Sequence, residues 1–103
     1  MNGTSDNNHT IALLHTAMQN MAAAAREQAW DRLEELDHER RRLTAMLNAG
    51  QKVSPEARRM IGEISRLDKT VLQLCAEQRD TQAAELRSLS SGRKVCAAYQ
   101  ANT

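Results

Sequence analysis

The chain has 103 residues, a length that suits one small domain with a single core. Hydrophobic residues make up 41% of it and charged residues 26%, a composition that excludes wholesale disorder. The formal net charge of +1 argues against a general nucleic-acid-binding protein, which would carry a strongly basic face. Phe is absent and Gly, Pro and β-branched residues are sparse, so we expect an aliphatic core between helices.

Neither a membrane segment nor a leader peptide is expected. No apolar run approaches the ~20 residues needed to cross a bilayer, and the polar start of the chain lacks the basic cluster of a signal peptide. Residues 1–8 are rich in Asn, Ser, Thr and Gly and are predicted to form a flexible tail. Cys75 and Cys96 either pair in a disulfide or, as we prefer, stay reduced. These features favour a soluble, cytoplasmic protein.

Apolar spacing predicts an all-α fold, an antiparallel bundle of three main helices at about 8–27, 29–48 and 54–91. In the first helix, apolar residues recur at steps of three and four, which places them on one face: Ile11, Leu14, Met18, Met21 and Ala25. No Gly or Pro separates the first helix from the second, so one continuous helix from 10 to 48 is an alternative. We favour a turn because Trp30 begins a new apolar stripe.

The second predicted helix carries many charges between its apolar positions Leu33, Leu36, Leu43 and Leu47. Asp37 with Arg41 and Glu39 with Arg42 have the spacing of surface ion pairs, each worth ~0.3 kcal/mol. Arg40 lies on the apolar stripe itself. We expect its aliphatic stem to cover the edge of the core, in preference to contacting a partner.

The third predicted helix has the clearest boundary. Gly50 can supply a left-handed residue that ends the preceding helix, Ser54 can cap the next one, and Pro55 suits its first position. Its stripe comprises Ala57, Met60, Ile64, Leu67, Val71 and Leu74. Because the next breaker is Gly92, this helix is expected to outlast the other two, and an apolar overhang would suit docking.

The bundle domain is therefore predicted to span residues 9–92. Residues 93–103 form a short C-terminal segment, which is either a partial last helix folded onto the bundle or a loose tail.

Nothing in the chain predicts catalysis, a metal or a cofactor. The three histidines, His9, His15 and His38, do not pair at helical spacing, and neither an H-E-x-x-H nor a C-x-x-C motif is present. Nucleotide-binding glycine motifs are also missing from the sequence. We therefore expect a binding protein that is not an enzyme.

One run of residues gives the chain a family resemblance. Trp30-Asp31, the leucines that follow, and Glu39-Arg40 lie after an Ala-rich helix and before a Pro-opened long helix, with Ala98-Tyr99 near the end. This order resembles the FliT-type flagellar export chaperones over roughly residues 10–100. Two features depart from that family: the turn before Trp30 lacks its usual glycine, and the segment after Tyr99 is short.

The resemblance implies a function as well as a fold. Members of that family bind the C-terminal helical region of the filament-cap protein and keep it soluble for type III export. They also contact the flagellar export gate and its ATPase, and some bind the flagellar master transcriptional regulator. Client binding is associated with the third helix, and a last helix covers that surface. The matching positions here are Ile64, Leu67, Val71 and Leu74 for partner binding, and Tyr99 for the cover.

Two other functions fit the same stripes. A structural homodimeric coiled coil or adaptor would need no client, and a small regulator would bind a transcription factor directly. The resemblance makes the export chaperone the preferred hypothesis.

Overall fold

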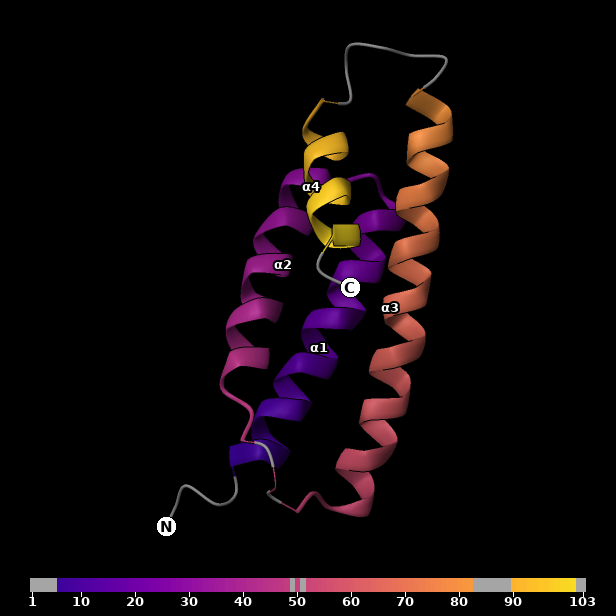
Figure 1. The fold of residues 1–103 in the computed structure, drawn as a ribbon. Coiled ribbons are helices and arrows are strands. Elements are labelled where there is room, and N and C mark those ends of the chain that lie inside the picture. Colours follow the sequence, from indigo (N-terminus) through magenta and orange to yellow (C-terminus); the bar gives the residue numbers. More distant parts are fainter. Residues whose placement is uncertain (1–5, 49, 51, 83–89, 102–103) are drawn as a thin grey trace.

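The computed structural model describes residues 6–48, 50, 52–82 and 90–101, and these form four α-helices. The helices are α1 (Asp6–Arg26), α2 (Trp30–Ala45), α3 (Pro55–Gln82) and α4 (Ser90–Ala101). They run alternately up and down, so each is antiparallel to the one before it (Figure 1). The predicted all-α antiparallel bundle with three main helices is confirmed.

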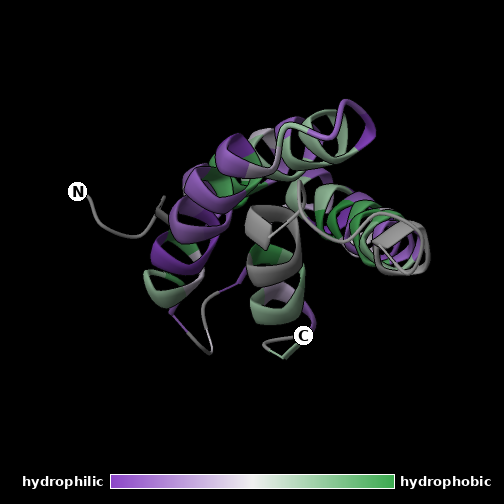
Figure 2. Cartoon of the chain, turned by 90° about the horizontal axis from the view of Figure 1, so that it is seen from above, coloured by the Kyte–Doolittle hydropathy of each residue, from purple (hydrophilic) through white to green (hydrophobic). Residues whose placement is uncertain are grey.

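The helices are arranged around α1. It contacts both α2 and α3 along its length, while α4 contacts α2 and α3 from the opposite side. A view down the bundle shows α4 lying between α2 and α3 (Figure 2). The order around the bundle is therefore α1, α2, α4, α3, and the last helix completes a ring that the first three leave open.

A sharp turn separates α1 from α2, as predicted, although it lacks a glycine. Gln28 takes a left-handed conformation with φ of 58°. Its amide donates to the Ala25 carbonyl at 3.1 Å, and the Ala29 amide donates to the Ala24 carbonyl at 2.8 Å. This pair of hydrogen bonds is the Schellman motif that commonly ends helices. Trp30 then begins α2 with its side chain buried.

The first residues of α1 hold the connection between α2 and α3. The Asn7 side chain donates to the Asn48 carbonyl at 2.9 Å and accepts from the Asn48 amide at 3.0 Å. Asn8 accepts a hydrogen bond from the Ser54 amide at 3.1 Å. Because α1 begins at Asp6 and Asn7 is buried, the flexible tail predicted for residues 1–8 is too long; residues 1–5 lie outside the described part.

The two ends of the α2–α3 connection were predicted with different accuracy. The α2 helix ends at Ala45, so Gly50, with φ of 90°, lies in the connection and does not cap the helix. At the other end, the Ser54 hydroxyl accepts a hydrogen bond from the Ala57 amide at 3.0 Å, and Pro55 is the first helical residue. The predicted cap of α3 is therefore confirmed.

The predicted third helix from 54 to 91 contains parts of two helices. The described part of α3 ends at Gln82, residues 83–89 lie outside the described residues, and Ser90 already belongs to α4. Gly92, which we expected to act as a breaker, lies inside α4. As far as Gln78, α3 does not overhang, because Val71, Cys75 and Gln78 are buried.

The largest core cluster joins all four helices. It contains the fully buried Met21, Leu33, Val71, Cys75 and Tyr99, with Trp30, Val95 and Cys96 around them. A smaller cluster of Leu14, Ala17 and Leu43 lies toward the other end of the bundle. The described C-terminal residues are thus part of the core, which settles the alternative between a docked helix and a loose tail.

Candidate functional site

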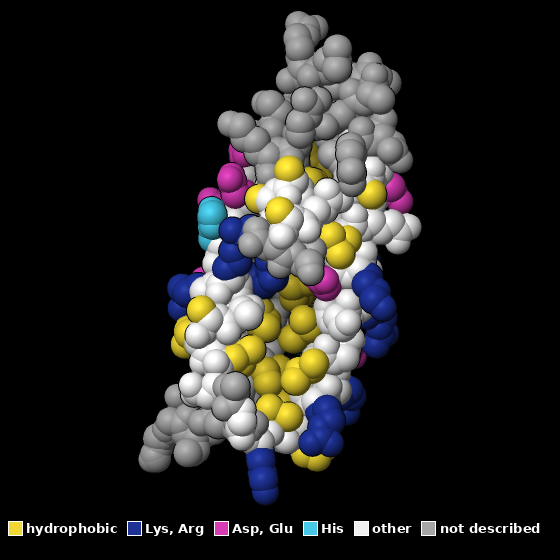
Figure 3. Space-filling model, in the orientation of Figure 1, with side chains coloured by type: hydrophobic (Ala, Val, Ile, Leu, Met, Phe, Trp, Pro, Cys, Tyr) yellow, Lys and Arg dark blue, Asp and Glu magenta, His cyan; other side chains and the backbone are white. Residues whose placement is uncertain are grey.

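A groove runs along the bundle between α2 and α3, with α1 as its floor; we call it the central groove. The α4 helix fills one half, the covered half, and leaves the other, the open half, exposed as an apolar hollow (Figure 3). The open half encloses about 300 Å³. Its lining comprises Leu14 and Met18 from α1, Arg40 and Thr44 from α2, and Ile61, Ile64, Ser65 and Asp68 from α3.

In the covered half, α4 buries a narrow apolar stripe. Val95, Cys96 and Tyr99 face the core and are each at most 5% exposed, whereas Ala97 and Ala98 are exposed. The spacing 95, 96, 99 is that of one helix face. The covered half therefore already binds an amphipathic helix, which in the structure is the chain's own α4.

Polar contacts fix α4 at the boundary between the two halves. The buried Tyr99 hydroxyl donates a hydrogen bond to the Asp68 carboxylate of α3. The Arg40 guanidinium of α2 lies over the Tyr99 ring, with its central carbon 5.0 Å from the ring centroid, a cation–π contact. One side chain of α4 thus connects to both walls of the groove.

A second set of contacts, centred on Asp37, holds Arg40 and Arg41 in place. Asp37 is only 3% exposed, and its oxygens lie 2.9 Å from both the Arg40 and the Arg41 guanidinium. Arg41 also donates to the Ala98 carbonyl on α4 at 3.4 Å. The predicted pair of Asp37 with Arg41 is confirmed, but Asp37 is buried against α4 and does not lie on a solvated face.

The environment of Tyr99 strongly favours its neutral form. Burial is the main cause that raises the pKa of the phenol above its usual range, and the hydrogen bond to the Asp68 carboxylate raises it further. The phenol can donate to Asp68 only while it keeps its proton. The contact therefore holds α4 across the neutral pH range.

Only one of the four predicted partner-binding residues lines the open half. Ile64 does so and is half-buried. Val71 is fully buried in the core, and Leu67 and Leu74 pack against the same core cluster. Tyr99, predicted as part of the cover, lies on α4 and is completely buried. The partner-binding roles themselves remain predictions.

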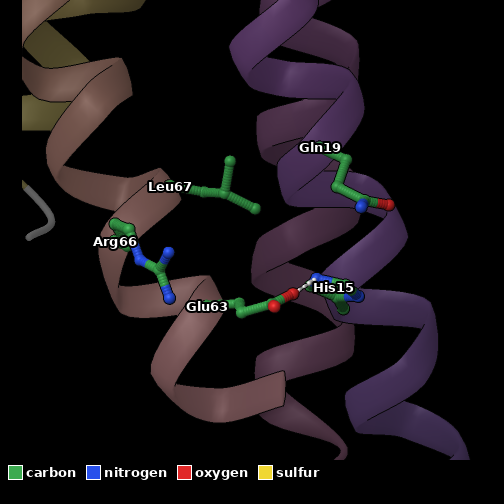
Figure 4. A pocket seen from close by; sticks show the side chains of 5 residues that line it. All are labelled: His15, Gln19, Glu63, Arg66 and Leu67. Carbon is green, nitrogen blue, oxygen red and sulfur yellow. Dashed lines mark ion pairs between the residues drawn. The ribbon is translucent and has the colours of Figure 1, made fainter. Parts of the chain in front are cut away.

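Leu67 lies beside a different hollow, on the α1–α3 side of the bundle (Figure 4). This hollow encloses about 180 Å³, and His15 and Glu63 approach each other across it, with 2.6 Å between Nε2 and Oε1. Gln19, Arg66 and Leu67 complete its lining. Glu63 is the carboxylate that faces His15, and no group of three or more possible metal ligands occurs among the described residues.

The sequence stripe contains only one of the α3 residues that face the groove, Ile64. The spacing of residues 57, 60, 64, 67, 71 and 74 marks the apolar face of α3, which packs mainly on α1. Besides Ile64, the α3 residues that line the groove are Ile61, Ser65 and Asp68, and each follows a stripe residue by one position in the sequence. The signal that could have found them is Ile61, a large apolar residue off the main stripe and 44% exposed.

The second predicted ion pair lies on the surface outside the groove. Glu39 and Arg42 form the predicted pair, with 2.6 Å between oxygen and nitrogen, and their hydrogen bond lowers the pKa of Glu39 and raises that of Arg42. In the described part of the chain, no helix is both long and apolar enough to span a membrane.

Comparison with known proteins places the chain in a family. Residues 8–101 match the family described as flagellar protein FliT, and the match extends into all four helices. No curated protein matches the chain. No solved structure matches it. The family match covers most of the sequence and agrees with the resemblance carried by Trp30-Asp31 and Glu39-Arg40. The chain therefore belongs to the FliT family of flagellar chaperones.

Proposed function

We propose that this protein is a cytoplasmic chaperone of flagellar type III export, and that its client is the C-terminal helical region of the filament-cap protein. The client helix binds in the central groove and takes the place of α4. The bound helix stays soluble because its apolar face is buried until export. This proposal extends to the partners that receive the complex, the export gate and its ATPase, and to the flagellar master transcriptional regulator as a further ligand.

The observation that carries the proposal is a helix-binding groove in a member of a flagellar chaperone family. The groove holds α4 through one apolar stripe and a few polar contacts at its edge. Such a groove suits any helix with apolar residues at the same spacing. The open half, with Ile61 exposed, offers further apolar surface that α4 leaves uncovered.

The structural coiled-coil alternative has less support. A dimer would have to use the apolar stripes of α1 and α3, but Met18, Met21 and Val71 are buried inside the single chain. Burial within the chain leaves these stripes no surface to offer a second copy.

Co-purification with the C-terminal segment of the filament-cap protein from the same bacterium, followed by light scattering, tests the proposal. We expect a stoichiometric complex whose mass equals one copy of each chain. The proposal would be refuted if neither the wild-type protein nor a variant with a released α4, such as Tyr99→Ala, binds the segment. A homodimer that persists in the presence of the segment would favour the structural coiled coil.

A further inference from the structure

We propose that the open half of the central groove is a landing site for an amphipathic helix with acidic flanks, occupied while α4 is still in the covered half. The inference rests on the proposed function and adds the order of events and the chemistry of the first contact. The partner helix binds beside α4 first, and α4 leaves afterwards.

The groove is longer than the helix that covers it. At 1.5 Å per residue, the 12 residues of α4 span about 18 Å, whereas the 16 residues of α2 and the 28 of α3 span about 24 Å and 42 Å. The C-terminal end of α4 points toward the open half (Figure 1). A helix bound there would continue the line of α4 between the same two walls, so the landing site is continuous with a surface that already binds a helix.

The floor and one wall of the open half require an apolar face on the partner. Ile61, with 44% of its surface exposed, and the half-buried Ile64 offer the accessible aliphatic surface, while Leu14 and Met18 line the floor and are themselves buried. A helix with apolar residues at steps of three and four would cover this surface. Burial of exposed aliphatic area is the main driving force for such binding.

The rim favours a partner with negative charge. Ile61, Ser65 and Lys69 follow one another at steps of four on α3, and Arg58 precedes Ile61 by three, so both cations border the groove and both are exposed. Arg40 lines the opposite wall and Arg41, next to it, contacts α4; both are paired with Asp37. Figure 3 shows Lys and Arg side chains on both sides of the apolar hollow. Acidic residues flanking the apolar face of the partner would complement this rim.

The two halves share residues, which links landing to release. Arg40 and Asp68 line the open half, and both also contact Tyr99 of α4. A helix that enters the open half and binds either side chain competes with α4 for it. Occupation of the landing site therefore weakens the hold on α4, and the remaining client residues replace it.

Two designed peptides of about 14 residues, ~21 Å as helices, test the landing site with the full chain. They share one apolar stripe and differ only in their flanks, which are Glu in one and Lys in the other. We expect the acidic peptide to bind at least about tenfold more tightly than the basic one, with an affinity that falls as salt rises. Ile61→Asp should weaken binding at least about tenfold, whereas Leu13→Asp, at an equally exposed site that lines neither hollow, should leave it unchanged.

The reactivity of the Cys96 thiol toward a soluble disulfide reagent separates landing from release. Cys96 lies on the buried face of α4 and is 5% exposed, so it reacts slowly while α4 is docked. We expect the acidic peptide to raise this rate by at most about fivefold, the effect of losing one contact to Tyr99, and the longer client segment to raise it at least about tenfold. The charge reversal Lys69→Glu should shift preference toward the basic peptide.

Three results would overturn the inference. The first is binding of neither peptide while the client segment still binds, which leaves the proposed function standing. The second is binding of the acidic peptide that exposes Cys96 as strongly as the client does. The third is concentration-dependent dimerisation that Ile61→Asp abolishes, since a second copy would then be the occupant.

Discussion

The two halves of the central groove differ in what covers them. In the covered half, α4 buries Tyr99 and Cys96 against α3 and completes the core of the protein. In the open half, α1, α2 and α3 leave Ile61 and a hollow of about 300 Å³ in contact with solvent. The difference teaches that the core and the proposed binding surface are adjacent faces of one helix. On α3 the face toward α1 stabilises the fold, and the face one residue further around is available to a partner.

The largest expected effect is the difference in unfolding free energy between substitutions on the two faces of α3. Val71→Asp places an unpaired charge at a fully buried site and should lower the free energy of unfolding by about 3–5 kcal/mol. Ile61→Asp should lower it by less than about 1 kcal/mol, because the site is partly solvated. Thermal and urea unfolding followed by circular dichroism measures both. Equal losses at the two sites would show that Ile61 belongs to the core.

Removal of the Tyr99 hydroxyl should weaken the docking of α4 without unfolding the bundle. Tyr99→Phe keeps the ring but loses the hydrogen bond to Asp68, which should cost the docking of α4 about 1 kcal/mol. Labelling of the Cys96 thiol should then be about fivefold faster, provided that labelling follows the open population. Thr70→Val, at an exposed hydroxyl of α3, is the matched control. An unchanged labelling rate in Tyr99→Phe would mean that the hydroxyl contributes nothing to docking.

Raising the pH should release the covered half. The phenol of Tyr99 has a raised pKa in the folded protein and an ordinary value of about 10 when exposed. Its contribution to stability is therefore complete below about pH 10 and is lost as the pH rises further toward the raised value.

The single tyrosine makes this effect measurable by the near-ultraviolet absorbance of tyrosinate. We expect ionisation well above the ordinary range in wild type. In Val95→Asp, which should undock α4, the ionisation should return to about pH 10. An ordinary titration in the wild-type protein would contradict the burial of Tyr99.

The smallest expected effect concerns the turn that leads into α2. Gln28 has a left-handed backbone that an L-residue adopts at a cost, whereas glycine adopts it freely. Gln28→Gly should therefore raise the free energy of unfolding by up to about 1 kcal/mol and leave binding to the groove unchanged. A loss of stability in urea unfolding would show that the turn does not need this conformation.

The features that sequence could predict are those that local spacing encodes. The stripe from Ile11 to Ala25 and the Ser54-Pro55 start gave two helices, because apolar periodicity and capping act over a few residues. The turn at Gln28 was favoured only through Trp30, since its own residues carry no turn signal. Ser90 and Gly92 suggested an end where a helix in fact runs, because the packing of α4 outweighs its local propensity.

The candidate site was harder to predict because it joins distant parts of the chain. Asp37, Arg40, Asp68 and Tyr99 come from three helices, and nothing in their local sequence indicates that they meet. The expectation that the Arg40 stem covers the core edge was incomplete, since its head group also contacts Asp37 and the ring of Tyr99. Ile61 was missed because the stripe that stabilises a helix is not the face it presents to a groove.

The central claim is that a client helix replaces α4 in the central groove, and thiol labelling of the bound complex tests it most directly. Single-cysteine variants, Cys75→Ala and Cys96→Ala, report the two positions separately, since Cys96 lies on α4 and Cys75 on the α3 wall beneath it. At saturating client segment we predict that Cys96 reacts at least about tenfold faster than in the free protein while Cys75 stays protected. A client that binds stoichiometrically and leaves Cys96 fully protected would contradict the account.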